Sequence, residues 1–150
     1  MRKHINLSIF SIFLLLMVPL FFVSCGGNGG PTTPQIPSTF KITDIKALSA
    51  DEVANLVVVA TYAINAKDEP FATGTLWLGD GSSEKIDGIQ LFKDRTQWQS
   101  SNIFHLYNIA GPLGTKATFH LKAEITVPFS TGTVKSTFEK DIEFTKTSWW

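Results

Sequence analysis

The sequence predicts an all-β domain over residues 39–150, built as an antiparallel sandwich of about seven strands. Apolar and polar residues alternate strictly over 117–127, which is typical of a strand with one buried face. Residues 55–65 are rich in β-branched and aromatic side chains, which also favour strands. The remaining body shows short apolar segments separated by turn signals and no convincing amphipathic helix, a pattern typical of sandwiches.

The first expected strand covers residues 39–48. Its apolar residues change parity at Asp44, and this change predicts a bend or a switch between sheets. The two pairs on opposite faces are Phe40 with Ile42, and Ile45 with Ala47. The second expected strand, 55–65, is apolar on both faces and is therefore predicted to be central.

The later strands are predicted at 71–79, 85–92 and 98–109, followed by a hairpin of 117–127 and 133–146 around the turn at 130–132. In the last strand Lys140 interrupts an otherwise apolar face, which predicts either a bulge or a position at the rim of the core. The apolar members of that face are Val134, Phe138, Ile142 and Phe144.

The start of the sequence predicts a signal peptide over residues 1–24. Arg2 and Lys3 are followed by a mostly apolar run at 9–23, which is shorter than the about 20 residues of a spanning helix. The run ends in Phe22-Val23-Ser24-Cys25, which resembles a bacterial lipobox, although that family prefers leucine first and alanine or glycine before the cysteine.

The lipobox resemblance implies a covalent lipid on Cys25 and cleavage before it, with the new amino terminus then acylated, for instance by palmitate. The alternative is an incidental cysteine within an uncleaved anchor. Gly26 follows the cysteine where aspartate would favour the inner membrane, so the resemblance implies a lipoprotein of the cell outer membrane. Cys25 is the only cysteine, and hence no intramolecular disulfide is expected.

Composition narrows the class of partner. Residues 25–38 are rich in glycine and proline and predict a flexible linker before the domain. The chain has 13 basic and 13 acidic residues, and removal of Arg2 and Lys3 leaves 11 against 13, a net charge of −2. No nucleic-acid partner is therefore expected. The expected partners are the membrane, through the lipid, and an envelope protein or a glycan.

Two short segments resemble polycystic-kidney-disease (PKD) domains, which are immunoglobulin-like sandwiches. The first is Thr75-Leu76-Trp77-Leu78-Gly79-Asp80-Gly81-Ser82, and the second runs from His105-Leu106-Tyr107 to Gly114-Thr115. The pattern departs from the family because Leu76 and Trp77 stand at its tryptophan and aspartate positions. A tight turn alone also explains Gly79-Asp80-Gly81, since Asp-Gly supplies the positive backbone dihedrals that such a turn needs.

No catalytic constellation can be assembled from the sequence, so we expect a protein without enzymatic activity. There is no G-x-S-x-G elbow for a nucleophile. His120 lies on a polar strand face and is expected to be solvated. His105 alternates with apolar residues and is expected to be a partly buried, hydrogen-bonded structural histidine rather than a base.

Ligand sites are predicted only weakly. Asp80, Glu84 and Asp87 could offer oxygen ligands to calcium, but their spacing is not that of a calcium loop and a solvated acidic turn is favoured, so neither a metal nor another cofactor is expected. Trp77 and Trp98 could stack on sugar rings if both are exposed, or they could be covered by the second sheet. We therefore expect a lipid-anchored interaction or assembly module, with a carbohydrate-binding module as the alternative and an enzyme as a remote third.

Overall fold

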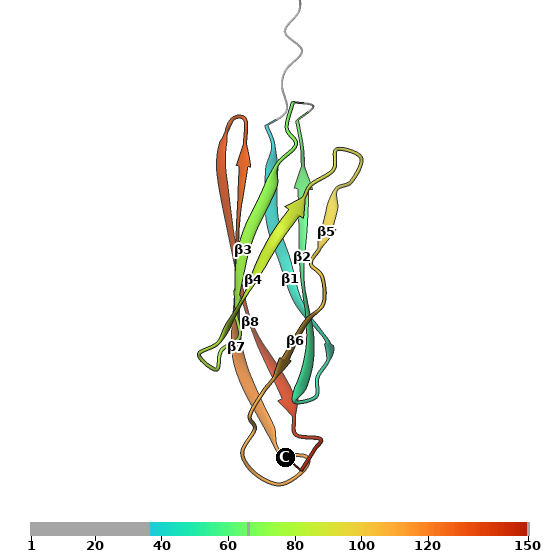
Figure 1. The fold of residues 1–150 in the computed structure, drawn as a ribbon, viewed down its shortest axis with the longest axis vertical. Helices are drawn as coiled ribbons and strands as arrows, with labels where there is room; N and C mark the ends of the chain where they lie inside the picture. The colour runs from blue at the N-terminus through green and yellow to red at the C-terminus, as the bar shows by residue number, and fades with distance from the viewer. Residues whose placement is uncertain (1–36, 66, 150) are drawn as a thin grey trace, which may run out of the picture. The chain divides into compact units, whose positions relative to one another are not determined.

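A computed structural model describes residues 37–65 and 67–149 of the chain (Figure 1). They form eight strands: β1 (Thr39–Ser49), β2 (Val53–Ala63), β3 (Phe71–Trp77), β4 (Ser83–Gln90), β5 (Gln97–Gln99), β6 (Ile103–Leu106), β7 (Lys116–Phe129) and β8 (Gly132–Thr145). Within these residues no helix is long and apolar enough to cross a membrane. The expected signal peptide, Cys25 and most of the expected linker lie outside the described residues.

Two antiparallel sheets face each other across one core. The first contains β1 and β2, with β5 and β6 both paired to the other edge of β2, and the second has the order β4-β3-β7-β8. This arrangement is an immunoglobulin-like β-sandwich, which confirms the predicted fold class. The central position predicted for the second strand is also confirmed, because β2 has neighbours on both sides.

The core consists of the inward rows of both sheets, as the alternation predicts. Every second residue of β7 from Leu121 to Phe129 is buried, and its neighbours lie toward solvent. The largest fully buried side chains include Ile42, Ile45, Leu56 and Val58 from the first sheet and Leu76, Leu121, Ile125 and Phe144 from the second. The strict period of two therefore separates the core face from the solvent face.

The parity change in the first strand is a β-bulge. The β1–β2 register shifts between Ile42 and Asp44, which confirms the predicted irregularity. The pairing of β7 with β8 runs without a shift through Lys140, so Lys140 occupies a rim position and not a bulge. Its ammonium group reaches across to the first sheet and donates to Asp44 Oδ1 at 2.8 Å and to the Ile45 carbonyl at 3.1 Å.

The single strand predicted at 98–109 is wrong, because the structure has two short strands there. Ser100 causes the interruption between β5 and β6. Its hydroxyl accepts the Val58 amide at 2.9 Å and donates to the Ser101 carbonyl at 2.9 Å, so a side chain replaces a rung of the backbone ladder. The register along β2 is offset by one residue across this interruption, as in a β-bulge.

The sandwich begins and finishes at opposite ends (Figure 1). We call the end where β1 starts the proximal end. There the buried Asp68 joins three segments, since it accepts hydrogen bonds from the Ser38 hydroxyl and, at 2.7 Å, from the Ser130 amide. The distal end contains the turn at 50–52, the loop at 107–115 and the end of β8, whose Thr145 amide donates to the Ala50 carbonyl at 2.9 Å.

Candidate functional site

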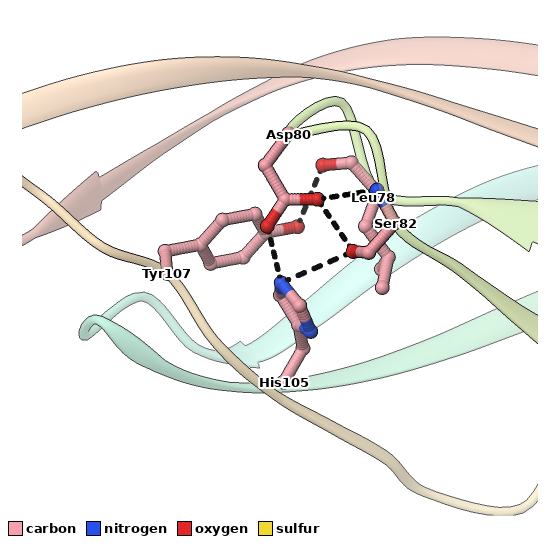
Figure 2. Close-up of polar contacts among 5 residues, drawn as sticks. All are labelled: Leu78, Asp80, Ser82, His105 and Tyr107. Atoms are coloured by element: carbon pink, nitrogen blue, oxygen red, sulfur yellow. Dashed lines mark hydrogen bonds and ion pairs between the residues drawn. The ribbon is translucent and has the colours of Figure 1, made fainter.

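A cluster of hydrogen-bonded residues lies where the β3–β4 turn meets β6 and the residue after it (Figure 2). We call it the Asp80 clamp, and its members are Leu78, Asp80, Ser82, His105 and Tyr107. The turn closes through a hydrogen bond from the Leu78 amide to the Ser82 carbonyl at 3.0 Å. Gly79 and Gly81 both have positive φ angles, of 83° and 96°, which explains why glycine flanks the aspartate.

Both carboxylate oxygens of Asp80 are hydrogen-bonded. Oδ1 accepts the Ser82 amide at 3.0 Å and the Ser82 hydroxyl, and Oδ2 accepts from His105 Nε2 at 2.7 Å. Partial burial alone would raise the pKa of Asp80, but the hydrogen bonds from Ser82 and His105 outweigh it and lower the pKa to about 2. The clamp therefore holds Asp80 ionised in ordinary buffers.

Tyr107 anchors the clamp to the core. Its hydroxyl donates to the Leu78 carbonyl at 3.1 Å, and its ring stacks on Phe119 and Phe144 with centroid distances of 4.2 and 4.5 Å. Burial raises the pKa of Tyr107 above its ordinary range. The phenol therefore remains a neutral donor that ties the turn to the interior.

The turn also packs closely against β7. A Cβ added at Gly79 would lie 2.7 Å from the His120 carbonyl oxygen and 2.9 Å from its amide nitrogen, both of which are backbone atoms. A Cβ added at Gly81 would meet nothing within 4 Å. Gly79 is therefore required for contact between the turn and β7, whereas Gly81 is required only for its backbone conformation.

The clamp resembles a catalytic triad in composition but not in geometry. A serine–histidine relay needs the carboxylate on one ring nitrogen and the hydroxyl on the other. Here Asp80 and Ser82 lie 2.7 and 3.5 Å from the same nitrogen, His105 Nε2. That nitrogen donates to the carboxylate and cannot also accept the serine proton. The arrangement is suited to holding a turn in place, and His105 is the partly buried structural histidine that the sequence predicts.

The two segments that resemble PKD domains meet in this clamp. Asp80 and Ser82 come from the first segment, and His105 and Tyr107 from the second. The meeting gives a physical role to both short motifs, because His105 and Tyr107 of the second segment donate hydrogen bonds to Asp80 and to the Leu78 carbonyl of the first. The family itself stays a prediction that rests on the motifs.

The structure does not bring Trp77 and Trp98 together on one face. Trp77 is on β3 and points outward from the second sheet, with 39% of its surface exposed. Lys122 Nζ lies 5.7 Å from the centroid of its ring and covers part of that surface. β7 and β8 also carry exposed ion pairs, among them His120 with Asp141 and Lys122 with Glu139. The hydrogen bond between His120 and Asp141 raises the pKa of His120.

Trp98 belongs to the other sheet. It lies on β5 opposite Ala60 and is partly buried against the core, at the open edge where β5 and β4 face each other. Two pockets, of about 450 and 320 Å³, are both lined by Trp98 together with Ile89 and Gln99. The larger of the two is lined by polar side chains around Trp98, among them Gln90, Arg95, Gln97 and Gln99.

The candidate calcium ligands are not gathered into a site. Asp80 is engaged in the clamp, while Glu84 and Asp87 lie on β4 with exposed side chains. Among residues 37–65 and 67–149, no three histidine, cysteine, aspartate or glutamate side chains are grouped so that they could hold a metal ion.

Sequence reasoning missed Glu52, in the turn between β1 and β2. Its side chain is only 2% exposed, and its Oε1 has no hydrogen-bond partner within the described part of the chain. It lines a pocket of about 380 Å³ together with Leu106, Tyr107, Asn108 and Ile109. The sequence contained one signal for this burial, because Glu52 has the same parity as the inward row that starts at Ala54.

Comparison of the chain with protein-family models, with characterised proteins and with solved structures gives no match.

Proposed function

We propose that this chain is a lipid-anchored protein of the bacterial cell envelope, whose immunoglobulin-like domain is a non-enzymatic interaction or assembly module. The observation that carries the proposal is the order of three features along the sequence. A positively charged start is followed by an apolar run that ends in Phe22-Val23-Ser24-Cys25, and a glycine- and proline-rich segment then leads into β1. This order is typical of a tethered lipoprotein, and Gly26 favours the outer membrane.

The geometry of the domain is consistent with a tether. The segment that contains Cys25 joins the sandwich at the proximal end, beside Ser38 and Asp68. The Glu52 pocket lies at the distal end, near the close of β8. A strand of 11 residues spans roughly 35 Å, so a partner bound distally would meet the domain well away from its attachment point.

The absence of enzymatic activity is supported by the clamp. Its histidine, serine and aspartate are the residues from which a hydrolase site could be built, yet their hydrogen bonds are directed at one another. A general base needs a free ring nitrogen within reach of its substrate and of the nucleophile together. In the clamp, the nitrogen nearest to Ser82 is already occupied by Asp80.

Processing of the precursor tests the anchor. Cells producing the wild-type chain and the Cys25→Ala variant would be fed labelled palmitate and fractionated. We expect labelled, shortened protein in the membrane fraction for the wild type, and unlabelled, full-length precursor for Cys25→Ala. Ser24→Ala is the matched control, since alanine is preferred before the cysteine of a lipobox, and it should be processed normally. Normal maturation of Cys25→Ala would disprove the lipid anchor.

A second candidate function is carbohydrate binding at Trp98. The observation that favours it is the pocket of about 450 Å³ in which glutamine side chains surround a partly exposed indole. Aromatic faces stack on sugar rings, and amide groups can hydrogen-bond the hydroxyls at the ring edge.

Tryptophan fluorescence of the full chain in detergent tests this candidate against peptidoglycan fragments and a panel of oligosaccharides. We expect a saturable change that Trp98→Ala abolishes and that Trp77→Ala, the matched control on the other sheet, retains. A response that depends on Trp77 instead would rule out the pocket, and a flat response would leave the protein-partner role alone.

A further inference from the structure

One oxygen of the Glu52 carboxylate, Oε1, is buried and has no hydrogen-bond partner among the described residues. The backbone on both sides is fixed, since its amide donates to the Thr145 carbonyl at 2.9 Å and its carbonyl accepts the Tyr107 amide at 2.8 Å. Oε1 nevertheless has no donor among the described residues, and none of the described ion pairs includes Glu52. A buried carboxylate oxygen without a hydrogen-bond donor is unfavourable in a folded protein.

The walls of the Glu52 pocket indicate which ligand would pair with this carboxylate. Leu106, Tyr107 and Ile109 contribute apolar surface, and among the described residues that line the pocket only Glu52 is acidic. Calcium takes six to eight oxygen ligands, so a pocket with one carboxylate is not suited to it. A lysine or arginine side chain fits better, because its apolar stem can lie along the walls while its charged head meets the carboxylate.

An exposed apolar strip next to the pocket points to a polypeptide. We call it the β2–β6 strip, and its members are Val53, Phe104 and Leu106, which are 50, 66 and 59% exposed. Val53 and Leu106 are direct cross-strand partners, and Phe104 follows on the same face of β6. Contiguous exposed apolar side chains mark interaction surfaces. Leu106 belongs to both the strip and the pocket, so one ligand would cover both.

We propose that the Glu52 pocket binds a lysine or arginine side chain of a polypeptide partner, and that neighbouring apolar side chains of the same partner cover the β2–β6 strip. A small organic cation would fill the pocket but leave the strip in water. This inference rests on the proposed role as an interaction module and names the chemistry of the partner. The binding experiments do not depend on the lipid. A negative result in them would therefore be distinct from a negative result in the processing experiment at Cys25.

The first experiment tests the pocket with a defined cation. The isotope-labelled full chain in detergent would be titrated with Nα-acetylarginine amide and with Nα-acetylcitrulline amide, its neutral isostere, and amide shifts at Glu52 and over 106–109 would be followed. We expect saturable shifts and at least about tenfold tighter binding of the arginine compound. Equal binding of the two compounds, or no saturable shift with either, would overturn the proposal.

Glu52→Gln separates a binding role from a structural one. We expect it to abolish the preference for arginine over citrulline while the melting temperature stays the same or rises, because the substitution keeps the shape of the side chain and breaks no hydrogen bond to Oε1. A variant that melts lower and keeps the preference would show that the carboxylate supports the fold and not a ligand.

The second experiment tests the strip. Random peptides displayed on phage would be selected on the full chain, and we expect the enriched peptides to carry a lysine or arginine flanked by apolar residues. Phe104 is exposed, and Phe104→Ser should weaken the binding of these peptides while the binding of the arginine compound stays unchanged. If selected peptides lack a basic residue, or if Phe104→Ser changes nothing, the ligand is not a polypeptide that covers both surfaces and that part of the proposal falls.

Discussion

Asp80 and Glu52 are two turn carboxylates that lie near Tyr107, and they differ in exposure and in hydrogen bonding. Asp80 keeps 25% of its side chain exposed and still has hydrogen-bond donors on both oxygens. Glu52 is 2% exposed, and one of its oxygens has no donor in the part of the chain that the structure describes. Water could hydrogen-bond to the more exposed Asp80 carboxylate more easily than to the buried Glu52 carboxylate, yet Asp80 is the one that has protein donors. The difference separates a carboxylate that stabilises a turn from one kept unpaired for a ligand.

Tyr107 contributes to both environments through different atoms. Its hydroxyl bonds to Leu78 in the clamp, while its amide bonds to the Glu52 carbonyl. The clamp thus fixes the segment that follows β6 and forms one wall of the Glu52 pocket. Changes in the clamp should therefore reduce stability strongly, and changes at Glu52 should alter binding with little loss of stability.

The largest effect is expected at Gly79. Gly79→Ala adds a Cβ against backbone atoms of His120 at a positive φ, and we expect a loss of about 3 kcal/mol in the free energy of unfolding. Gly81→Ala is the matched control, because it shares the positive φ but meets no atom, and it should lose only about 1 kcal/mol. Denaturant unfolding measures both. Equal losses would show that close approach to β7 does not hold the clamp.

Tyr107→Phe should have the next largest effect. It leaves the Leu78 carbonyl without its donor inside the core and retains the aromatic stacking, so we expect a loss of about 1–2 kcal/mol. Tyr62→Phe is the comparison, since the Tyr62 hydroxyl donates to the Phe92 carbonyl at a part-buried site, at 3.2 Å. If Tyr62→Phe lowers the free energy of unfolding more than Tyr107→Phe does, the hydrogen bond of Tyr107 in the clamp is not the stronger of the two tyrosine hydrogen bonds.

Asp80→Asn should have a smaller, pH-dependent effect. The folded pKa of Asp80 is lowered to about 2 from an ordinary 3.8, so its ionised form stabilises the fold. That stabilisation is fully present above about pH 4 and is lost as the pH falls through 2. Solvent screening limits it to about 1 kcal/mol. Unfolding at neutral and acidic pH should show the difference between the two proteins shrink below about pH 4 and disappear only below about pH 2, and a constant difference would contradict the assignment.

Glu52→Gln is the isosteric counterpart of Asp80→Asn and should have the smallest effect on stability. We expect no loss at neutral pH, or a gain of up to about 1 kcal/mol, because no hydrogen bond to Oε1 is broken. Thermal unfolding of the two variants side by side measures the contrast. If both amide substitutions destabilise equally, the distinction between the two carboxylates is lost.

Most of the fold could be predicted because its signals are local. The alternation in 117–127 and the parity change at Asp44 each reflect which face of a strand a residue occupies, and this depends only on spacing. The interruption at Ser100 could not be predicted in this way. It depends on a serine hydroxyl that accepts the amide of Val58, a residue 42 positions away.

The candidate sites were less predictable because they form between distant segments. The motif around Asp80 and the motif around His105 were both visible, but the sequence alone does not state that they are in contact. Glu52 in Asp51-Glu52 has the composition of a solvated acidic turn, and its burial depends on where β6 and β8 lie. The sequence likewise does not state that Trp77 and Trp98 lie on different faces. Their separation arises because β3 and β5 belong to different sheets.

The opposite placement of the two ends of the sandwich has a mechanical consequence. A pull between a tether at Thr39 and a partner at Glu52 would act along the length of β1. The force would pass through the covalent backbone of β1, which is already nearly extended as a β-strand, and the β1–β2 hydrogen bonds would not lie between the two points of attachment. The β1–β2 pairing would be spared, and the domain would extend very little under a load between the proposed anchor and a partner bound at Glu52.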